Sequence, residues 1–257
     1  MKILVTGANG FLGTKLINIL SKEFEIIGTD LPELDLIDKN SVFKFFNKIK
    51  PDVVIHTAAM TNVDLCETEQ DKAYKLNVEV TENVVDACKK VNSKLIYIST
   101  DFVFDGKKGN YKEEDKTNPL NYYGKTKLEC EKVVINSNVD YLITRVAMLY
   151  GYNSENDKNT FVKWAINSLK EGKEINVIND QFGCPTLIDD IANALITLIK
   201  NNNWGVYHVV GPEKVSIYEW ALKINKIFGF NGKINPVDTS FLNQKAKRPL
   251  ISDLNTQ

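Results

Sequence analysis

The sequence predicts an α/β protein, a Rossmann-type doubly wound parallel sheet with a small C-terminal part. Three observations predict it. Short apolar runs alternate with longer amphipathic stretches through about the first 145 residues. The apolar runs are almost continuous Val, Ile and Leu, and a glycine-rich turn directly follows the first of them. Strands that alternate with helices are joined by right-handed crossovers and therefore run parallel.

The predicted strands of the first part are the apolar runs at residues 2–6, 25–29, 52–56, 94–98 and 141–145. Between them, helical spacing covers residues 11–20, 41–49, 69–91 and 122–136. Strands without polar alternation are typical of a sheet whose two faces are both covered by helices.

After residue 150 the pattern loosens. A polar loop at 153–159 is followed by predicted helices at 160–170 and 188–200 and a predicted strand at 205–210. We expect residues 1–150 to form a nucleotide-binding domain to which residues 187–212 return. Residues 151–186 and 213–257 would form the substrate-binding part.

Composition excludes several classes of protein. The net charge is −1, so no basic surface is expected to attract nucleic acid or an anionic membrane. No apolar run approaches the roughly 18 residues of a membrane span. The cysteines are scattered, without the spacing of a zinc site. We therefore expect a cytoplasmic protein with reduced thiols, and no nucleic-acid or membrane partner.

The segment TGANGFLG joins the first predicted strand to the first helix, with glycines at 7, 10 and 13. Such glycines allow a tight turn, a close approach of backbone to a pyrophosphate, and close packing of helix on strand. The free N–H groups of the helix then face the phosphates. The residues predicted to bind a dinucleotide here are Gly7, Asn9, Gly10, Phe11, Leu12 and Gly13. A purely structural glycine turn is the alternative.

Asp30 ends the second predicted strand, 17 residues beyond Gly13. A carboxylate there can accept the ribose hydroxyls of NAD and repels the 2′-phosphate of NADP. We therefore expect NAD(H) to be preferred, with NADP(H) as the alternative, unless Asp30 only shapes the turn before Pro32. Asp35 and Leu36 are expected to flank the adenine. The small residues of Ala58-Ala59-Met60, after the third strand, are expected to border the cofactor.

Three residues form the predicted catalytic group. Thr100 follows the fourth strand, and Tyr123 and Lys127 share a face of the next helix. A tyrosine can protonate a carbonyl oxygen that gains charge as hydride arrives at its carbon. We expect Lys127 to lower the pKa of Tyr123 and to hold the nicotinamide ribose, and Thr100 to hydrogen-bond the oxyanion. A half-buried tyrosine on an ordinary amphipathic helix is the alternative.

Longer segments add a family resemblance. TGANGFLG, STDFVFDG, YYGKTK and LYG resemble the extended short-chain dehydrogenases/reductases. HTAAMTNVDLCE, PLNYYGKTKLECEK, INDQFGCPT and RPLISDL are similar to the dTDP-4-dehydrorhamnose reductases, over nearly the whole chain. The resemblance implies NAD(P)H-dependent reduction of a nucleotide-linked 4-ketosugar, dTDP-4-dehydrorhamnose to dTDP-L-rhamnose. It also implies substrate contacts for Thr100, Asp101 and Met148, with Arg248 near the substrate diphosphate.

The sequence departs from that family at three positions. Met148 replaces a tryptophan that forms one wall of the substrate site, and Met60 replaces a histidine. Some family members are magnesium-linked dimers, so a homodimer is a candidate assembly. Lys15 stands where those members carry a metal-binding glutamate, so we expect no metal site.

Two other classes share these motifs. The regulatory beta subunit of methionine adenosyltransferase also carries an STD-type segment and an apolar residue in place of the tryptophan, which leaves a dinucleotide-binding regulatory subunit as the alternative. Nucleotide-sugar epimerases and dehydratases share the early motifs. The segment INDQFGCPT favours the reductases over both.

Overall fold

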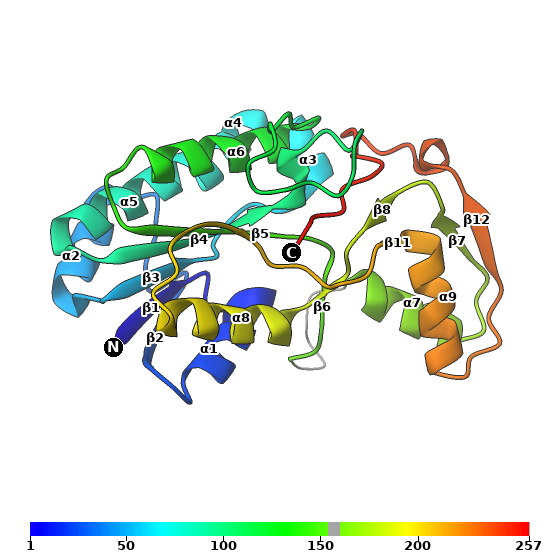
Figure 1. Cartoon of the computed structure of the whole chain (residues 1–257), viewed down its shortest axis with the longest axis horizontal. Helices are drawn as coiled ribbons and strands as arrows, with labels where there is room; N and C mark the ends of the chain where they lie inside the picture. Colours follow the sequence, from blue (N-terminus) through cyan, green and yellow to red (C-terminus); the bar gives the residue numbers. More distant parts are fainter. Residues whose placement is uncertain (154–159, 257) are drawn as a thin grey trace.

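The computed structural model describes residues 1–153 and 160–256 (Figure 1). Within them a six-stranded parallel sheet has the order β10-β5-β4-β3-β1-β2. Its strands are β1 (Lys2–Thr6), β2 (Glu25–Thr29), β3 (Val53–His56), β4 (Lys94–Thr100), β5 (Tyr141–Val146) and β10 (Gly205–His208). The predicted parallel α/β sheet is confirmed.

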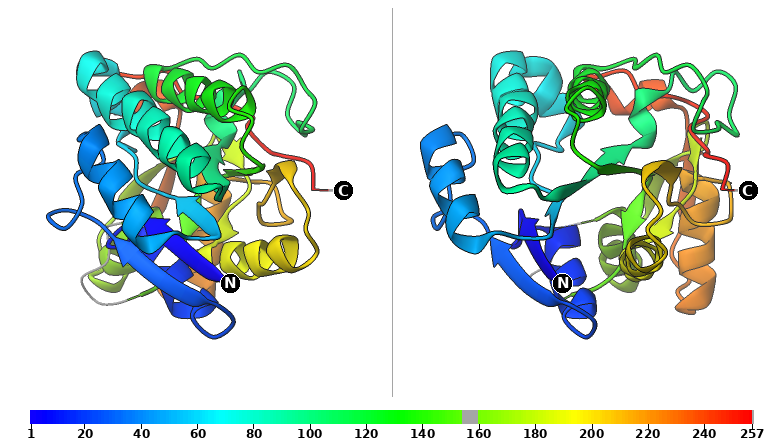
Figure 2. Two further views of the ribbon diagram at one scale, coloured as in Figure 1. Left: turned by 90° about the vertical axis from the view of Figure 1, so that its left-hand side faces the viewer. Right: turned by 60° about the vertical axis from the view of Figure 1, so that its left-hand side comes forward.

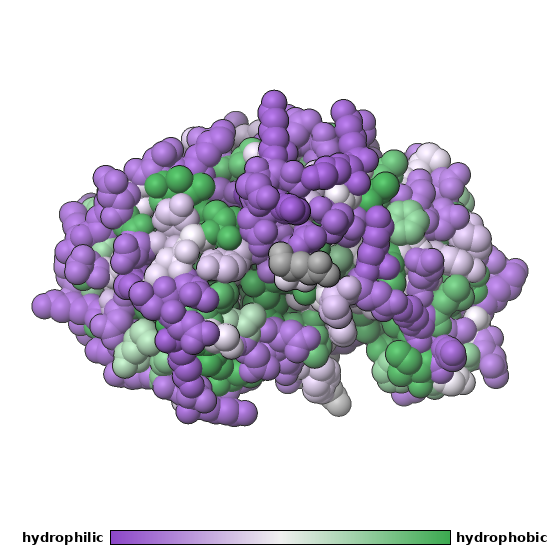
Figure 3. Space-filling model, viewed as in Figure 1, coloured by the Kyte–Doolittle hydropathy of each residue, from purple (hydrophilic) through white to green (hydrophobic). Residues whose placement is uncertain are grey.

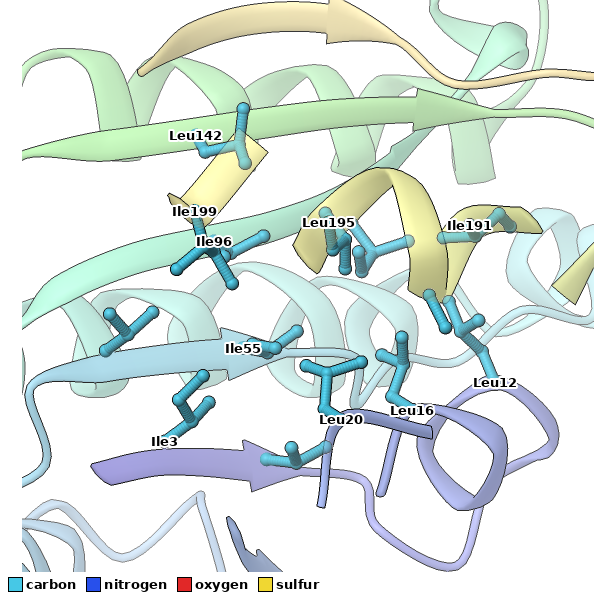
Figure 4. Close-up of a cluster of buried hydrophobic side chains, with 14 of the residues drawn as sticks. Ile3, Leu12, Leu16, Leu20, Ile55, Ile96, Leu142, Ile191, Leu195 and Ile199 are labelled. Carbon is cyan, nitrogen blue, oxygen red and sulfur yellow. The ribbon is translucent and has the colours of Figure 1, made fainter. Parts of the chain in front are cut away.

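Helices cover both faces of the sheet, as the apolar strands predict (Figures 1 and 2). On one face lie α1 (Phe11–Leu20) and α8 (Ile188–Lys200), which pack on each other and on alternate strand residues (Figure 4). On the other lie α2 (Lys39–Ile49), α5 (Val80–Val91) and α6 (Tyr122–Ile135). The strand side chains therefore alternate between two separate apolar cores.

The predicted helical segment at 69–91 is confirmed, but it is not one regular α-helix. The chain there forms α4 (Gln70–Tyr74), a π-helical turn η1 (Lys75–Glu79) and then α5. A further helix, α3 (Val63–Thr68), precedes them; it was not predicted, although Asn62 caps it by accepting a hydrogen bond from the Leu65 N–H. A π-helical turn is rare and occurs mostly as a single turn inside an α-helix, so helical spacing alone does not predict it.

The sheet order creates a crevice at one edge. From β1 the chain passes to β2 on one side, then crosses back to β3 on the other. Connections leave the sheet in opposite directions at this point, and a crevice opens beyond the carboxyl ends of β1 and β3. The glycine-rich turn lies directly at this position.

The second part of the molecule packs around its own apolar cluster, at the right of Figure 1. Its helices are α7 (Phe161–Lys170) and α9 (Ile217–Ile227), the latter begun by a Ser216/Glu219 capping box. Short strands pair across it: β7 (Ile175–Ile178) with β12 (Ile234–Val237), β8 (Phe182–Gly183) with β11 (Val215–Ser216), and β6 (Leu149–Tyr150) with β9 (Thr186–Leu187). The predicted polar loop at 153–159 lies, apart from its first residue, outside the described residues.

After the 3-10 turn η3 (Thr239–Leu242), the chain returns to the first part of the molecule. Residues 245–255, here called the C-terminal segment, cross back toward the main sheet (Figure 1). Tyr111 pairs with Leu254 in an isolated parallel bridge, and the Tyr111 N–H donates to the carbonyl oxygen of Asp253. Residues remote in sequence from the sheet are thereby brought to its edge.

Hydrophilic side chains cover most of the face shown in Figure 3. Among the helices of residues 1–153 and 160–256, none is both long and apolar enough to cross a bilayer.

Candidate active site

Two neighbouring cavities lie beyond the carboxyl ends of the strands. One has a volume of about 420 Å³ and the other about 580 Å³, and both are bordered by Gly10, Thr57 and Ala59. They share these lining residues and lie side by side at the point where the strand order reverses. This is the position at which open α/β sheets bind ligands.

The smaller cavity extends from the glycine turn to Asp30, just after β2. Its wall is mainly apolar, with Leu31, Leu34 and Val80 among its residues. The predicted cofactor residues that border it are Gly7, Gly10, Asp30, Asp35, Leu36, Ala58, Ala59 and Met60. The predicted residues Gly10, Phe11, Leu12 and Gly13 border the larger cavity. Asn9 borders neither, but its backbone N–H donates to the Asp30 carboxylate at 3.0 Å.

The glycine turn leaves no room for side chains. Gly7 has φ +71°, and a Cβ atom there would lie 2.8 Å from the backbone nitrogen of Ala58. A Cβ atom on Gly13 would lie 2.1 Å from the carbonyl oxygen of Gly7. Strand, turn and helix therefore approach one another as closely as backbone allows. The residues present fit a dinucleotide whose pyrophosphate lies against the start of α1.

Asn77 holds the wall of the smaller cavity through Met60, a contact that the sequence did not predict. Its side-chain oxygen accepts from the Met60 N–H at 2.7 Å, and its amide nitrogen donates to the Met60 carbonyl oxygen at 3.2 Å. The same amide donates to the Thr126 hydroxyl at 2.9 Å. Asn77 lies in the π-helical turn and is only 1% exposed. Its three contacts connect the Met60 loop to α6.

The larger cavity brings the predicted catalytic residues together. Thr100, Asp101, Tyr123, Lys127 and Met148 all border it. Asn121 caps α6 by accepting from the Gly124 N–H at 2.8 Å, which places Tyr123 in the first helical turn. Lys127, one turn further, donates to the carbonyl oxygen of Ile98 at 2.6 Å.

Burial is the largest influence on the pKa values of Tyr123 and Lys127. It raises the pKa of Tyr123, while a hydrogen bond with Thr100 lowers it. Burial lowers the pKa of Lys127 to about 8. The lowering of the Tyr123 pKa by Lys127 stays a prediction. The desolvation of the phenol is the largest effect, and the lysine ammonium is directed at the backbone of β4.

Asp101 is a buried carboxyl group at the cavity wall, 3% exposed. It accepts hydrogen bonds from the Thr100 hydroxyl at 3.0 Å and from the Ser252 hydroxyl at 2.6 Å. Burial raises its pKa to about 6. Ser252 belongs to the C-terminal segment and was not predicted as a site residue, because its place beside Asp101 depends on a contact 151 residues apart.

Met148 forms part of the cavity wall in an unusual backbone conformation. Its φ is +45°, a region that residues other than glycine seldom adopt. Its sulfur atom lies only 2.6 Å from the position that a Cβ atom on Gly183 would take, so the side chain packs closely on that glycine. Val63, Thr160 and Phe161 also border this cavity and were not predicted.

Arg248 borders neither cavity. Its guanidinium forms a two-pronged ion pair with Asp64, with N–O distances of 2.8 and 2.9 Å, and also donates to the carbonyl oxygen of Ala246. Arg145, the other arginine, pairs with Glu131. Lys15, at the family's metal-binding position, pairs with Asp189 at 3.2 Å. In the part of the chain that the structure describes, no group of three or more His, Cys, Asp or Glu could hold a metal ion.

The parallel sheet, the glycine turn at its switch point and the Thr100, Tyr123 and Lys127 group define an extended short-chain dehydrogenase/reductase, an oxidoreductase with a nicotinamide dinucleotide cofactor. The model of the RmlD substrate binding domain family matches residues 1–257. The chain belongs to this family.

Individual relatives agree with this assignment. The chain is 35% identical to a dTDP-4-dehydrorhamnose reductase of Aggregatibacter actinomycetemcomitans, over 98% of this chain and 90% of the relative. It is 30% identical to methionine adenosyltransferase 2 subunit beta of Bos taurus, over 93% and 76%. The crystal structure of a Bacillus anthracis dTDP-4-dehydrorhamnose reductase in complex with NADP is similar, with a TM-score of 0.95 and 36% identity, covering 100% of this chain and 90% of that one.

Proposed function

We propose that the chain reduces the keto group of a nucleotide-linked 4-ketosugar, with dTDP-4-dehydrorhamnose as substrate and dTDP-L-rhamnose as product. One observation carries the proposal. Thr100, Asp101, Tyr123 and Lys127 border a single cavity that adjoins the glycine-lined one. The reductases among the relatives supply the identity of the sugar and the nucleotide base.

The residues of the larger cavity suit proton delivery to a ketone oxygen. When bound, the nicotinamide dinucleotide supplies the hydride. Tyr123 donates its phenolic proton to the carbonyl oxygen as negative charge develops there. Because burial raises its pKa, the phenol stays protonated at neutral pH. Thr100 donates a hydrogen bond to the same oxygen, and Lys127 holds the nicotinamide ribose.

We assign the cofactor preference to Asp30. Its carboxylate accepts from the Asn9 and Leu31 N–H groups, and these fix it at the border of the smaller cavity. Lys72, which also borders this cavity, is paired with Glu69 at 2.8 Å. The charge balance favours NAD(H) over NADP(H), although a relative binds NADP.

The alternative is a regulatory subunit, because the chain is similar to a methionine adenosyltransferase beta subunit over most of its length. Such a protein needs the dinucleotide cavity but not the proton donor. The arrangement of Tyr123, Thr100 and Lys127 around one cavity favours the reductase.

The proposal predicts consumption of NADH by the purified protein with dTDP-4-dehydrorhamnose. The assay should include a panel of nucleotide 4-ketosugars and both reduced cofactors, with product identified by mass spectrometry. Absence of turnover with the whole panel, together with capture of a methionine adenosyltransferase in a pull-down, would favour the regulatory alternative. Sedimentation analysis of the same sample tests for the homodimer, and cell fractionation tests the cytoplasmic location.

A further inference from the structure

Three residues of α6 attach one face of that helix to the end of β4. Tyr123, Lys127 and Glu131 are spaced by four, so they lie on the same helix face. Tyr123 interacts with the Thr100 hydroxyl, and Lys127 donates to the Ile98 carbonyl oxygen at 2.6 Å. Two of the three are the proposed catalytic residues, and the third lies one turn behind them.

Glu131 makes the third contact with the strand. The Ser99 hydroxyl donates to its carboxylate at 2.5 Å, and Glu131 is only 1% exposed. Ser99 lies between Ile98, whose carbonyl oxygen holds Lys127, and Thr100, whose hydroxyl lies beside Tyr123. A shift of Ser99 therefore moves both of these groups.

Arg145 of β5 fixes the carboxylate in turn. Its guanidinium nitrogens donate to the two oxygens of Glu131 at 3.0 and 2.8 Å. A third hydrogen bond joins Arg145 to the carbonyl oxygen of Glu113 at 3.1 Å. A buried ion pair seldom adds net stability over well-packed apolar side chains, because both charges lose their hydration. Its presence directly behind the catalytic residues calls for another explanation.

We infer that Glu131 is a positioning residue of the reductase: through Ser99 it sets the end of β4, and with it the Lys127 ammonium and the Thr100 hydroxyl. The inference rests on the proposed function, since it assigns a role in that same site.

The charge of Glu131 has a second consequence for Lys127. Burial lowers the pKa of that lysine to about 8, and the nearby acids Cys130 and Glu131 raise it. The titratable or charged groups that face Lys127 from the packed elements are His56 of β3, Tyr97 of β4, Tyr123, Cys130 and Glu131 of α6, and, through Glu131, Arg145 of β5. Loss of the Glu131 charge removes an anion near Lys127 and leaves the positive charge of Arg145 without its partner. Both effects lower the pKa of Lys127 further.

The test is Glu131→Gln, with Glu129→Gln as the matched control because Glu129 pairs with Lys132 on the exposed side of the same helix. For Glu131→Gln we expect kcat to fall about tenfold with KM within about twofold. The basic limb of the kcat profile should move down by about one pH unit. Glu129→Gln should match the parent in all three quantities. A folded Glu131→Gln protein with the parent's kcat and pH profile overturns the inference.

Ser99→Ala tests the positioning step without disturbing the ion pair, and therefore serves if Glu131→Gln does not fold. We expect kcat to fall about threefold with the basic limb unmoved; an unchanged kcat overturns the inference. If the parent itself reduces no ketosugar, the proposed function fails instead. NADH titration by fluorescence then decides the inference: the affinity of Glu131→Gln should fall at a lower pH than that of the parent, and coincident curves overturn it.

Discussion

Arg248 pairs with Asp64 through two hydrogen bonds of 2.8 and 2.9 Å, which join the C-terminal segment to α3. Asp64 directly follows Val63, a residue of the larger cavity. The pair therefore lies close behind the cavity wall rather than within it. The same arginine is the one expected beside the substrate diphosphate.

Arg248→Ala tests that assignment. A charge-assisted hydrogen bond is worth about 1.5–3 kcal/mol, so KM for the ketosugar should rise roughly ten- to a hundredfold with NADH affinity unchanged. Asp64→Asn, which frees the guanidinium for a diphosphate, should leave KM unchanged or lower it. A loss of thermal stability in Arg248→Ala with KM intact would show that the arginine only fastens the C-terminal segment.

Tyr123→Phe removes the proposed proton donor and keeps the ring that packs on Phe102. We expect kcat to fall by roughly 10²–10⁴, with NADH binding nearly intact. Its neighbour Tyr122 supplies the control, and Tyr122→Phe should keep the parent's kcat. Steady-state kinetics and a fluorescence titration measure both quantities. Full turnover in Tyr123→Phe would mean that another group delivers the proton.

Asp30→Ala should weaken NADH binding and reduce the preference for NADH over NADPH. The change removes two carboxylate contacts with backbone N–H groups and the charge that repels a 2′-phosphate. The ratio of kcat/KM for the two cofactors measures the effect. Equal use of NADPH by the unmodified protein would contradict the role given to Asp30.

Asp101 should give the reaction an acidic limb near pH 6. Burial raises its folded-state pKa to about 6, so the carboxylate becomes protonated as the pH falls through that value. If the carboxylate accepts a hydrogen bond from the sugar, KM should rise below pH 6. Asp101→Asn should remove this limb. If the KM of the parent does not change between about pH 5 and about 7, Asp101 does not take part in substrate binding.

The raised pKa of Asp101 also has a consequence for stability. The folded state holds this proton more tightly than the unfolded chain does, so the contribution is favourable at low pH and is lost as the pH rises through about 6. Thermal unfolding of the parent and of Asp101→Asn on both sides of pH 6 measures the difference. As the pH rises through about 6, the melting temperature of Asp101→Asn should increase relative to that of the parent.

Met148→Trp should make the sugar cavity more selective. A flexible thioether adapts to different ligands, whereas a planar indole restricts the space. We expect the ratio of kcat/KM between the best and the poorest ketosugar of a panel to widen roughly tenfold. Met60→Leu, at the smaller cavity, is the control. An unchanged ratio would mean that Met148 does not contact the sugar.

Much of this site follows from local sequence. Local sequence predicts the glycine turn, the place of Asp30 after β2, and the shared helix face of Tyr123 and Lys127. Each of these features lies within one strand, turn or helix. Alternating apolar runs likewise predict the sheet and the helices on its two faces. The π-helical turn and α9 were not predicted; the π-helical turn has no distinct sequence signal of its own.

Only the tertiary structure decided the contacts between distant residues. Ser252 against Asp101, Asn77 against the Met60 loop, and Arg248 against Asp64 join segments 17 to 184 residues apart. The pKa values of Tyr123 and Lys127 also depend on the tertiary structure, because desolvation depends on everything that packs around a group. Local sequence thus determined which reactive side chains the protein has. Burial and long-range packing decided their pKa values and which of the charged groups are already paired.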